Sequence, residues 1–111
     1  MKWWAHLYKG RKAELAGPEL LKKIEKNGFL PEVYVITSGR MGHHLFEIHP
    51  VMLLSSQERE KAFVLGVALG DREAAETVRR MVEDMVRTTG GFRWEQYMSR
   101  LDETDAGQAG E

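Results

Sequence analysis

The chain has 111 residues, of which 42% are apolar and 30% are charged, and its formal net charge is -1. These values are typical of one globular domain and exclude a disordered or fibrous protein. The absence of cysteine excludes disulfides, thiolate metal sites and cysteine nucleophiles, and the apolar run before Lys9 is too short for a signal peptide or a membrane span, which favours a cytoplasmic protein.

Charge is unevenly distributed along the chain. Residues 1–40 hold eight basic and four acidic side chains, a net charge of +4. The segment 102–111 contains four acidic residues and neither a basic nor an aromatic one. Because this segment has no large apolar side chain to bury, we predict a disordered acidic tail after a single domain formed by residues 1–101.

The first predicted elements, in chain order, are a strand, a helix and a hairpin. The aromatic run WWAHLY at 3–8 is bounded by a Lys-Gly pair and predicts a strand. In GPELLKKIEKNG, Pro18 suits the first position of a helix and Asn27 suits its left-handed end. The run VYVITS at 33–38 predicts a strand buried on both faces, which the turn GRMG connects to a second strand, HHLFEIH at 43–49.

The later segments predict a helical turn, a strand and two helices. PVMLLSSQER favours a short helical turn, and the unbroken apolar run AFVLGVALG at 62–70 predicts a strand in the middle of the sheet. An apolar stripe at helical spacing predicts a helix at 72–89 that ends at Gly90. The segment RWEQYMSRL at 93–101 shows the same spacing and predicts a short C-terminal helix.

This order, β-α-β-β-β-α-α, predicts an α+β fold. We expect a four-stranded, mainly antiparallel sheet with two principal helices packed on one face, distantly ferredoxin-like. The succession of three strands in the middle departs from the ferredoxin-like order. In this arrangement the second face of the sheet is open, and an open face is where a function would be sought.

Two segments, VYVITSG…LFEI…LL and VLGVALGDREAAETVRRMVEDMVRTTGGF, carry a family resemblance. Over about residues 30–101 the chain resembles a group of small uncharacterised bacterial proteins of about this length. The shared features are a strand, a Gly-Asp turn, an amphipathic helix and a Thr-Gly-Gly ending. The resemblance implies a bacterial protein and brings with it no activity, cofactor or catalytic residue.

Three of the four histidines stand in HHLFEIHP, with a carboxylate among them, and suggest a metal site. Side chains of a strand alternate between faces, so Glu47 and His49 point the same way, about 6.6 Å apart at Cα, whereas His43 is about 13 Å from Glu47. A tetrahedral ion needs a further ligand, which His6 supplies only if the first strand lies beside this one. We therefore predict that the protein binds no metal and no cofactor. If a metal did bind, the candidate ligands would be Glu47, His49 and His6.

The aromatic first strand resists a purely structural interpretation. Alternation places Trp4, His6 and Tyr8 on one face, and their large apolar bodies with polar tips are typical of interfaces. In the glycine-flanked loop SGRMGHH, Arg40 could grip a carboxylate or a phosphate, and His43 faces the same way as the candidate metal ligands. These five residues form the predicted interface or ligand face. The alternative is that the C-terminal helix folds back and covers this face.

Three functions stay open. The leading one is a non-enzymatic binding or assembly module that forms a homodimer through its open sheet face. The second is single-stranded nucleic-acid binding, in which Trp4 and Tyr8 stack on bases; it is weakened because RNA-recognition signatures are absent and glutamates interleave with the basic residues. The third is a small metal-dependent hydrolase built on the candidate metal ligands, with Arg40 as anion clamp. The basic residues that would follow a nucleic-acid backbone are Lys9, Arg11, Lys12, Lys22, Lys23 and Lys26.

Overall fold

The structure, a computed structural model, describes residues 1–39 and 45–109. Its strands are β1 (Lys2–Lys9), β2 (Val33–Ser38), β3 (Phe46–Pro50) and β4 (Phe63–Leu69). Its helices are α1 (Arg11–Ala16), α2 (Glu19–Glu25), the 3-10 turn η1 (Val51–Leu53), α3 (Ser56–Lys61), α4 (Asp71–Thr89) and α5 (Trp94–Ala109). The chain divides into two compact units, Met1–Arg79 and Arg80–Glu111, which are described separately. The prediction of one domain over residues 1–101 stays a prediction.

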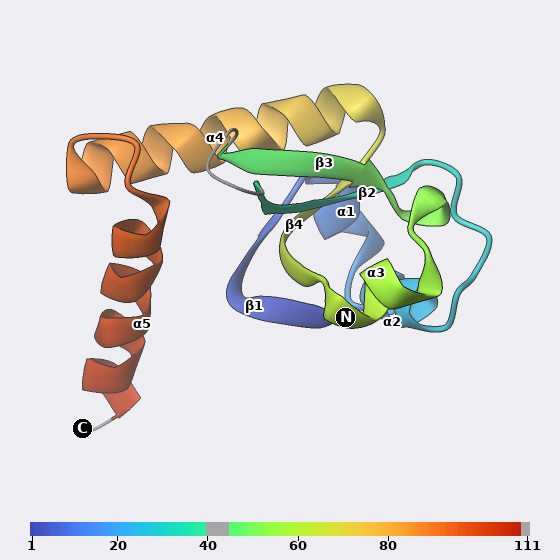
Figure 1. The fold of residues 1–111 in the computed structure, drawn as a ribbon, viewed down its shortest axis with the longest axis horizontal. Coiled ribbons are helices and arrows are strands. Elements are labelled where there is room, and N and C mark those ends of the chain that lie inside the picture. The colour runs from blue at the N-terminus through green and yellow to red at the C-terminus, as the bar shows by residue number, and fades with distance from the viewer. Residues whose placement is uncertain (40–44, 110–111) are drawn as a thin grey trace. The chain divides into compact units, whose positions relative to one another are not determined.

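The first unit is built on a four-stranded sheet in the order β1-β4-β2-β3 (Figure 1). The hairpin of β2 and β3 is antiparallel as predicted, and β2 is also antiparallel to β4. However, β1 runs parallel to β4, so the sheet is mixed rather than mainly antiparallel. The expected class, α+β, is confirmed, but the expectation of a mainly antiparallel, distantly ferredoxin-like sheet is wrong, because β1 lies beside β4 and runs parallel to it.

Helices cover both faces of this sheet, which corrects the expected arrangement on one face. Figure 1 shows α1, α2 and α3 on one side of the strands and the beginning of α4 on the other side. Val35 and Ile36, neighbours in β2 whose side chains point to opposite faces, are both fully buried. A strand with continuous apolar residues needs apolar cover on both faces, and the beginning of α4 supplies cover on the second face. The open face expected from the sequence is therefore not found in the described part of the chain.

The face under α1 and α2 carries a contiguous apolar core. Fully burying one valine or isoleucine side chain stabilises a fold by about 1.5–3 kcal/mol. As predicted, α2 ends just before Asn27, which adopts the left-handed conformation with φ of 58°. The indole Nε1 of Trp3 donates a hydrogen bond of 2.6 Å to Glu25 and so ties β1 to α2. The buried members of this core are Ala13, Leu20, Ile24, Val33, Val35, Val51, Val64 and Val67.

One carboxylate holds the starts of α1 and α4 and the end of β4 together. Glu73, in the first turn of α4, accepts backbone hydrogen bonds from Lys12 at 2.6 Å, from Ala13 at 3.3 Å and from Leu69 at 2.7 Å. The first N–H groups of a helix have no partner inside it and attract negative charge. Gly10, the residue before α1, has no side chain that could cap the helix. Glu73 therefore acts as the cap of α1 from another helix.

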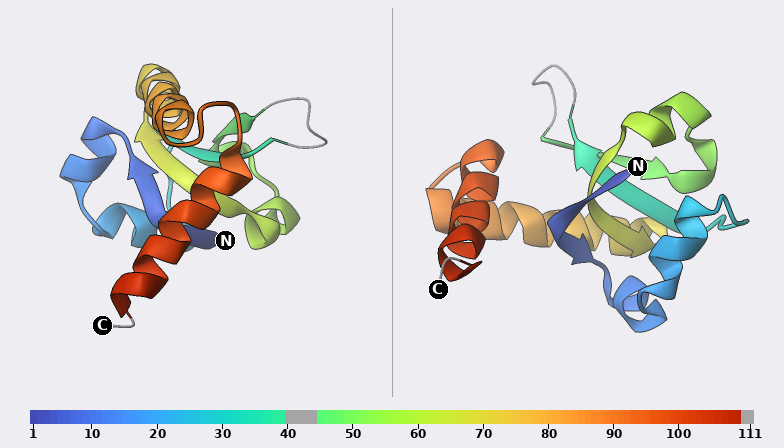
Figure 2. Two further views of the ribbon diagram at one scale, coloured as in Figure 1. Left: turned by 90° about the vertical axis from the view of Figure 1, so that its left-hand side faces the viewer. Right: turned by 90° about the horizontal axis from the view of Figure 1, so that it is seen from below.

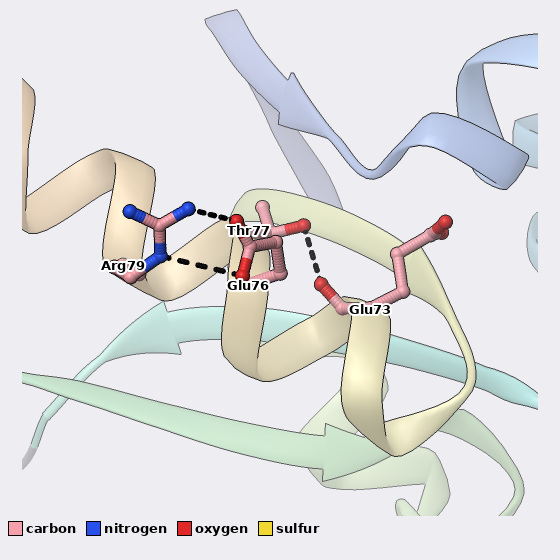
Figure 3. Close-up of polar contacts among 4 residues, drawn as sticks. All are labelled: Glu73, Glu76, Thr77 and Arg79. Carbon is pink, nitrogen blue, oxygen red and sulfur yellow. Dashed lines mark hydrogen bonds and ion pairs between the residues drawn. The ribbon is translucent and has the colours of Figure 1, made fainter.

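This cap requires a glycine at position 10. A Cβ atom added to Gly10 would lie 2.3 Å from Cγ of Glu73, closer than real atoms approach. Figure 3 shows how α4 continues from Glu73: the hydroxyl of Thr77 donates a hydrogen bond of 2.8 Å to the Glu73 carbonyl. On the exposed side of the same helix, Arg79 pairs with Glu76. The two glutamates thus differ in role, one joining three elements and one forming a surface pair.

The second unit contains the end of α4, a glycine turn and α5. Gly90 ends α4 as predicted, with φ of 80° and a hydrogen bond of 2.8 Å from its N–H to the carbonyl of Val86. The hydroxyl of Thr89 donates to the carbonyl of Met85 at 2.9 Å and fixes the last turn. In α5, the rings of Trp94 and Tyr97 lie 5.1 Å apart and both side chains are buried.

The C-terminal helix is longer than the sequence predicts. It was expected to end at residue 101, where the acidic tail begins, but α5 continues to Ala109. The helix thus extends eight residues beyond the expected end, and the predicted disorder of the segment 102–111 stays a prediction. Helix formation needs no burial of apolar side chains when the turns simply extend an existing helix, since nucleation is the unfavourable step.

Candidate functional site

Strand β3 places Glu47 and His49 on the face of the sheet that carries α3. The backbone register pairs Glu47 with Thr37 and His49 with Val35 on β2, so all four side chains share this face. Nε2 of His49 lies 3.4 Å from Oε1 of Glu47, and both side chains are about a quarter exposed, 26% and 27%. The prediction that these two side chains point the same way is confirmed.

The environment of these two residues differs from the wet surface that the sequence suggests. In an alternating strand with one buried face, Phe46 and Ile48 would be the core residues of β3, and Glu47 and His49 would face the solvent. In the structure Ile48 is 41% exposed, more than either of the two polar side chains. The cause is that β3 is an edge strand whose polar face is partly covered by the segment after it, η1 and α3 (Figure 2, where α3 lies beside β3).

Between β3, the end of β2 and α3 lies a pocket of about 440 Å³. Glu47 and His49 form one side of it, and α3 with the first residues of β4 forms the other. A volume of this size is within the range of small-ligand sites, which is about 300–1,000 Å³. The described residues that line this pocket are Thr37, Ser38, Glu47, His49, Leu54, Gln57, Glu58, Lys61, Ala62 and Phe63.

The wall formed by α3 is held in place by its own hydrogen bonds. Ser55 and Glu58 form a capping box: the hydroxyl of Ser55 accepts from the Glu58 N–H at 3.1 Å, and the Glu58 carboxylate accepts from the Ser55 N–H at 3.0 Å. The guanidinium of Arg59 donates to the carbonyls of Ile24 at 3.0 Å and Val51 at 3.2 Å. These bonds tie α3 to α2 and η1, so the pocket is formed before any ligand arrives.

Several polar residues of the pocket are not engaged by the described part of the chain. Among the described residues, none forms a hydrogen bond or an ion pair with the side chain of Thr37, Ser38, Gln57 or Lys61. All four residues line this single pocket; by the alternation of β2, the Thr37 side chain points to the face of Glu47 and His49, and the Ser38 side chain to the other face. Beside them, Leu54, Ala62 and Phe63 offer an apolar wall. Apolar walls with a few convergent polar groups are typical of ligand sites.

The aromatic residues of β1 lie elsewhere. The Trp4 ring lies 5.4 Å from the His6 ring and 6.3 Å from the Tyr8 ring, so the three share one face as predicted. A Cβ atom added to Gly66 would lie 3.5 Å from Cβ of Tyr8 and 3.1 Å from Ile36, which puts this row on the face of Ile36, opposite to the pocket. Trp4 is only 4% exposed.

This placement separates the three candidate metal ligands. His6 is on β1 and Glu47 and His49 are on β3, at opposite edges of the sheet with two strands between them (Figure 2). With strands about 4.8 Å apart, that separation is about 14 Å, far beyond the reach of one ion. Within the described residues, no three His, Cys, Asp or Glu side chains are grouped so as to hold a metal ion.

Two predicted site residues, Arg40 and His43, lie outside the described residues. Conversely, the sequence did not reveal that Thr37, Ser38 and the residues of α3 gather around Glu47 and His49. The alternation of β2 puts Thr37 on the face of Val35, and the register of the hairpin puts it beside Glu47. The alternation of β2 and the register of the hairpin would therefore have predicted that Thr37 lies beside Glu47.

None of the family models, curated proteins or solved structures compared with the chain matches it. The resemblance to small bacterial proteins stays a prediction. None of the helices in the described ranges is long and apolar enough to cross a membrane.

Proposed function

We propose that this protein is a binding module for a small molecule and that its ligand occupies the pocket between β3 and α3. The observation that carries the proposal is the content of the pocket: about 440 Å³ lined by an apolar wall and by polar side chains without protein partners among the described residues. Binding requires no rearrangement of α3, because the capping box and Arg59 already hold this helix.

The other two functions have less support from the described residues. Base stacking on β1 would need an accessible indole, whereas Trp4 is only 4% exposed. A metal-dependent hydrolase would need a third ligand beside Glu47 and His49, and His6 is at the opposite edge of the sheet. Both functions would need groups other than the ones that the sequence suggested.

Homodimer formation through Trp4, His6 and Tyr8 stays a prediction with a weaker basis. It rested on an open aromatic face, whereas Trp4 is buried and His6 and Tyr8 are partly buried. Sedimentation at several concentrations up to tens of micromolar tests it: a chain that stays monomeric throughout contradicts the dimer.

A neutral probe with an apolar ring, phenethyl alcohol, tests the binding function. A probe of this size binds with a Kd in the millimolar range, which backbone amide NMR shifts can follow. The shifts should be concentrated at pocket residues such as Thr37, Gln57 and Phe63. Shifts elsewhere, or none up to tens of millimolar, would contradict the proposed site.

A variant that fills the pocket provides the control. Gln57 is exposed and lines the pocket from α3, so Gln57→Trp should abolish the shifts of the other pocket residues while the melting temperature stays the same. Ser56 is exposed and does not line the pocket, so Ser56→Trp should leave the shifts unchanged.

A further inference from the structure

Resting on the proposed function, we infer the class of ligand: an organic anion with a carboxylate group on an apolar body about the size of one ring. The pocket contains two carboxylates of its own, Glu47 and Glu58, which at first sight favour a cationic ligand. The decisive question is which of its polar groups are already engaged by the protein.

Both carboxylates of the pocket have protein partners. Oε1 of Glu47 lies 3.4 Å from the His49 imidazole. Oε1 of Glu58 accepts the N–H of Ser55 at 3.0 Å, as part of the capping box that starts α3. A cationic ligand would have to compete with these contacts, and at Glu58 it would weaken the start of α3.

The groups that no described residue engages can all donate hydrogen bonds, and one of them, the Lys61 ammonium, is positively charged and donates without also accepting. Within the described part of the chain, the ammonium of Lys61 has no anionic partner, and the amide of Gln57 has no bonded partner. The hydroxyl of Thr37, across the pocket on β2, has no hydrogen-bond partner among the described residues either. An ionised carboxylate only accepts hydrogen bonds, and charge-assisted bonds to it are the strong ones. The pocket thus offers one cation and several donors to a single acidic group.

The apolar part of the pocket defines the rest of the ligand. Leu54, Ala62 and Phe63 line it together with the donors, and the Phe63 side chain is 41% exposed. Covering the apolar surface of this wall removes it from water, which favours a ligand with an apolar body over a small inorganic anion. The shape and the donors together indicate an aryl or alkyl carboxylate.

Three probes with the same apolar body and different charges test this inference: phenylacetate, phenethylamine and phenethyl alcohol. Amide shifts of the pocket residues give a Kd for each probe with the full chain. Phenylacetate should bind about fivefold more tightly than the alcohol, and the amine should bind more weakly than either. The size of this preference corresponds to one partly exposed ion pair.

A lysine variant shows whether Lys61 is the cause. Lys61→Met keeps the aliphatic stem and removes the charge, so it should lower phenylacetate affinity about fivefold and leave alcohol affinity unchanged. Lys23→Met, at an exposed lysine on α2 that does not line the pocket, should change neither.

The outcomes separate the two proposals. If the alcohol binds in the pocket but the amine binds as tightly as phenylacetate or more tightly, the ligand class is wrong and the binding function stands. A phenylacetate preference that survives Lys61→Met also overturns the inference. If no probe shifts the pocket residues, both proposals are wrong.

Discussion

Two half-buried glutamates of the first unit, Glu73 and Glu47, differ in the groups that contact them. Glu73 accepts three backbone hydrogen bonds, at 2.6, 2.7 and 3.3 Å, from residues of β4 and α1. Glu47 has a side-chain partner, the His49 imidazole at 3.4 Å, and lines a pocket. The Glu73 carboxylate is held by backbone N–H groups, whose directions are fixed by α1 and β4. The second faces a space where another molecule fits.

The difference indicates how to tell a structural carboxylate from a candidate functional one. Burial is similar for the two residues, so burial alone does not separate them. The type of partner does separate them. Backbone N–H groups at a helix start destabilise the fold when they lose their acceptor, whereas an imidazole at a pocket can form a hydrogen bond with water instead. Stability measurements should therefore respond strongly to Glu73 and weakly to Glu47.

The largest effect is expected for Glu73→Ala. It leaves three backbone donors without their acceptor, and we expect a loss of about 3 kcal/mol in the free energy of unfolding, measured by urea denaturation. Glu76→Ala on the same helix is the matched control. Glu76 pairs with Arg79 while both are more than half exposed, so its loss should stay within about 0.5 kcal/mol. Equal losses for the two variants would contradict the role of Glu73 as a cap.

Gly10→Ala should have the next largest effect, about 2 kcal/mol, because the new methyl group displaces the Glu73 side chain from the N–H groups that it accepts. The two substitutions act on one contact, so Gly10→Ala should cost much less in the Glu73→Ala background. Gly91→Ala is the control, since an added Cβ there meets no atom within 4 Å. Additive losses in the double variant would show that Gly10 acts through something other than Glu73.

The strands and helices with strong local patterns were predictable. The runs at 33–38 and 62–70 are continuously apolar, and the helix at 72–89 has one apolar stripe, so each appears within a residue or so of its observed bounds. The pairing of β1 with β4 was not predictable, because the residue pattern of a strand does not show which strand lies beside it. The same continuous runs did imply cover on both faces, and the expectation of an open face disregarded that signal.

The candidate site was only partly predictable for a similar reason. Alternation within β3 correctly placed Glu47 and His49 together, since it depends on local geometry alone. The contribution of α3 depends on how a helix packs across the end of the sheet, which local spacing does not reveal. Glu73 gave no side-chain signal either, because its partners are backbone N–H groups; the only trace in the sequence is a glycine just before α1.

A third, smaller effect concerns the other carboxylate of the pocket, Glu58. Ser55→Ala removes the hydroxyl that caps α3, and we expect a loss of about 1 kcal/mol in the free energy of unfolding. Ser56→Ala, at the first exposed residue of the helix, should stay within about 0.5 kcal/mol. A similar loss in both variants would mean that the capping box does not stabilise α3.

The smallest effect on stability, and the sharpest contrast with Glu73, is expected for Glu47→Gln. The amide keeps the shape of the side chain and removes its charge, so unfolding should change by no more than about 1 kcal/mol, the value of a partly exposed pair. Binding of phenylacetate should become about two- to threefold tighter, because the variant removes a negative charge beside the proposed carboxylate position whether or not His49 is protonated. NMR titration of both forms measures the change. Weaker binding of phenylacetate in Glu47→Gln would show that this carboxylate helps to hold the ligand, and would favour a cationic ligand instead.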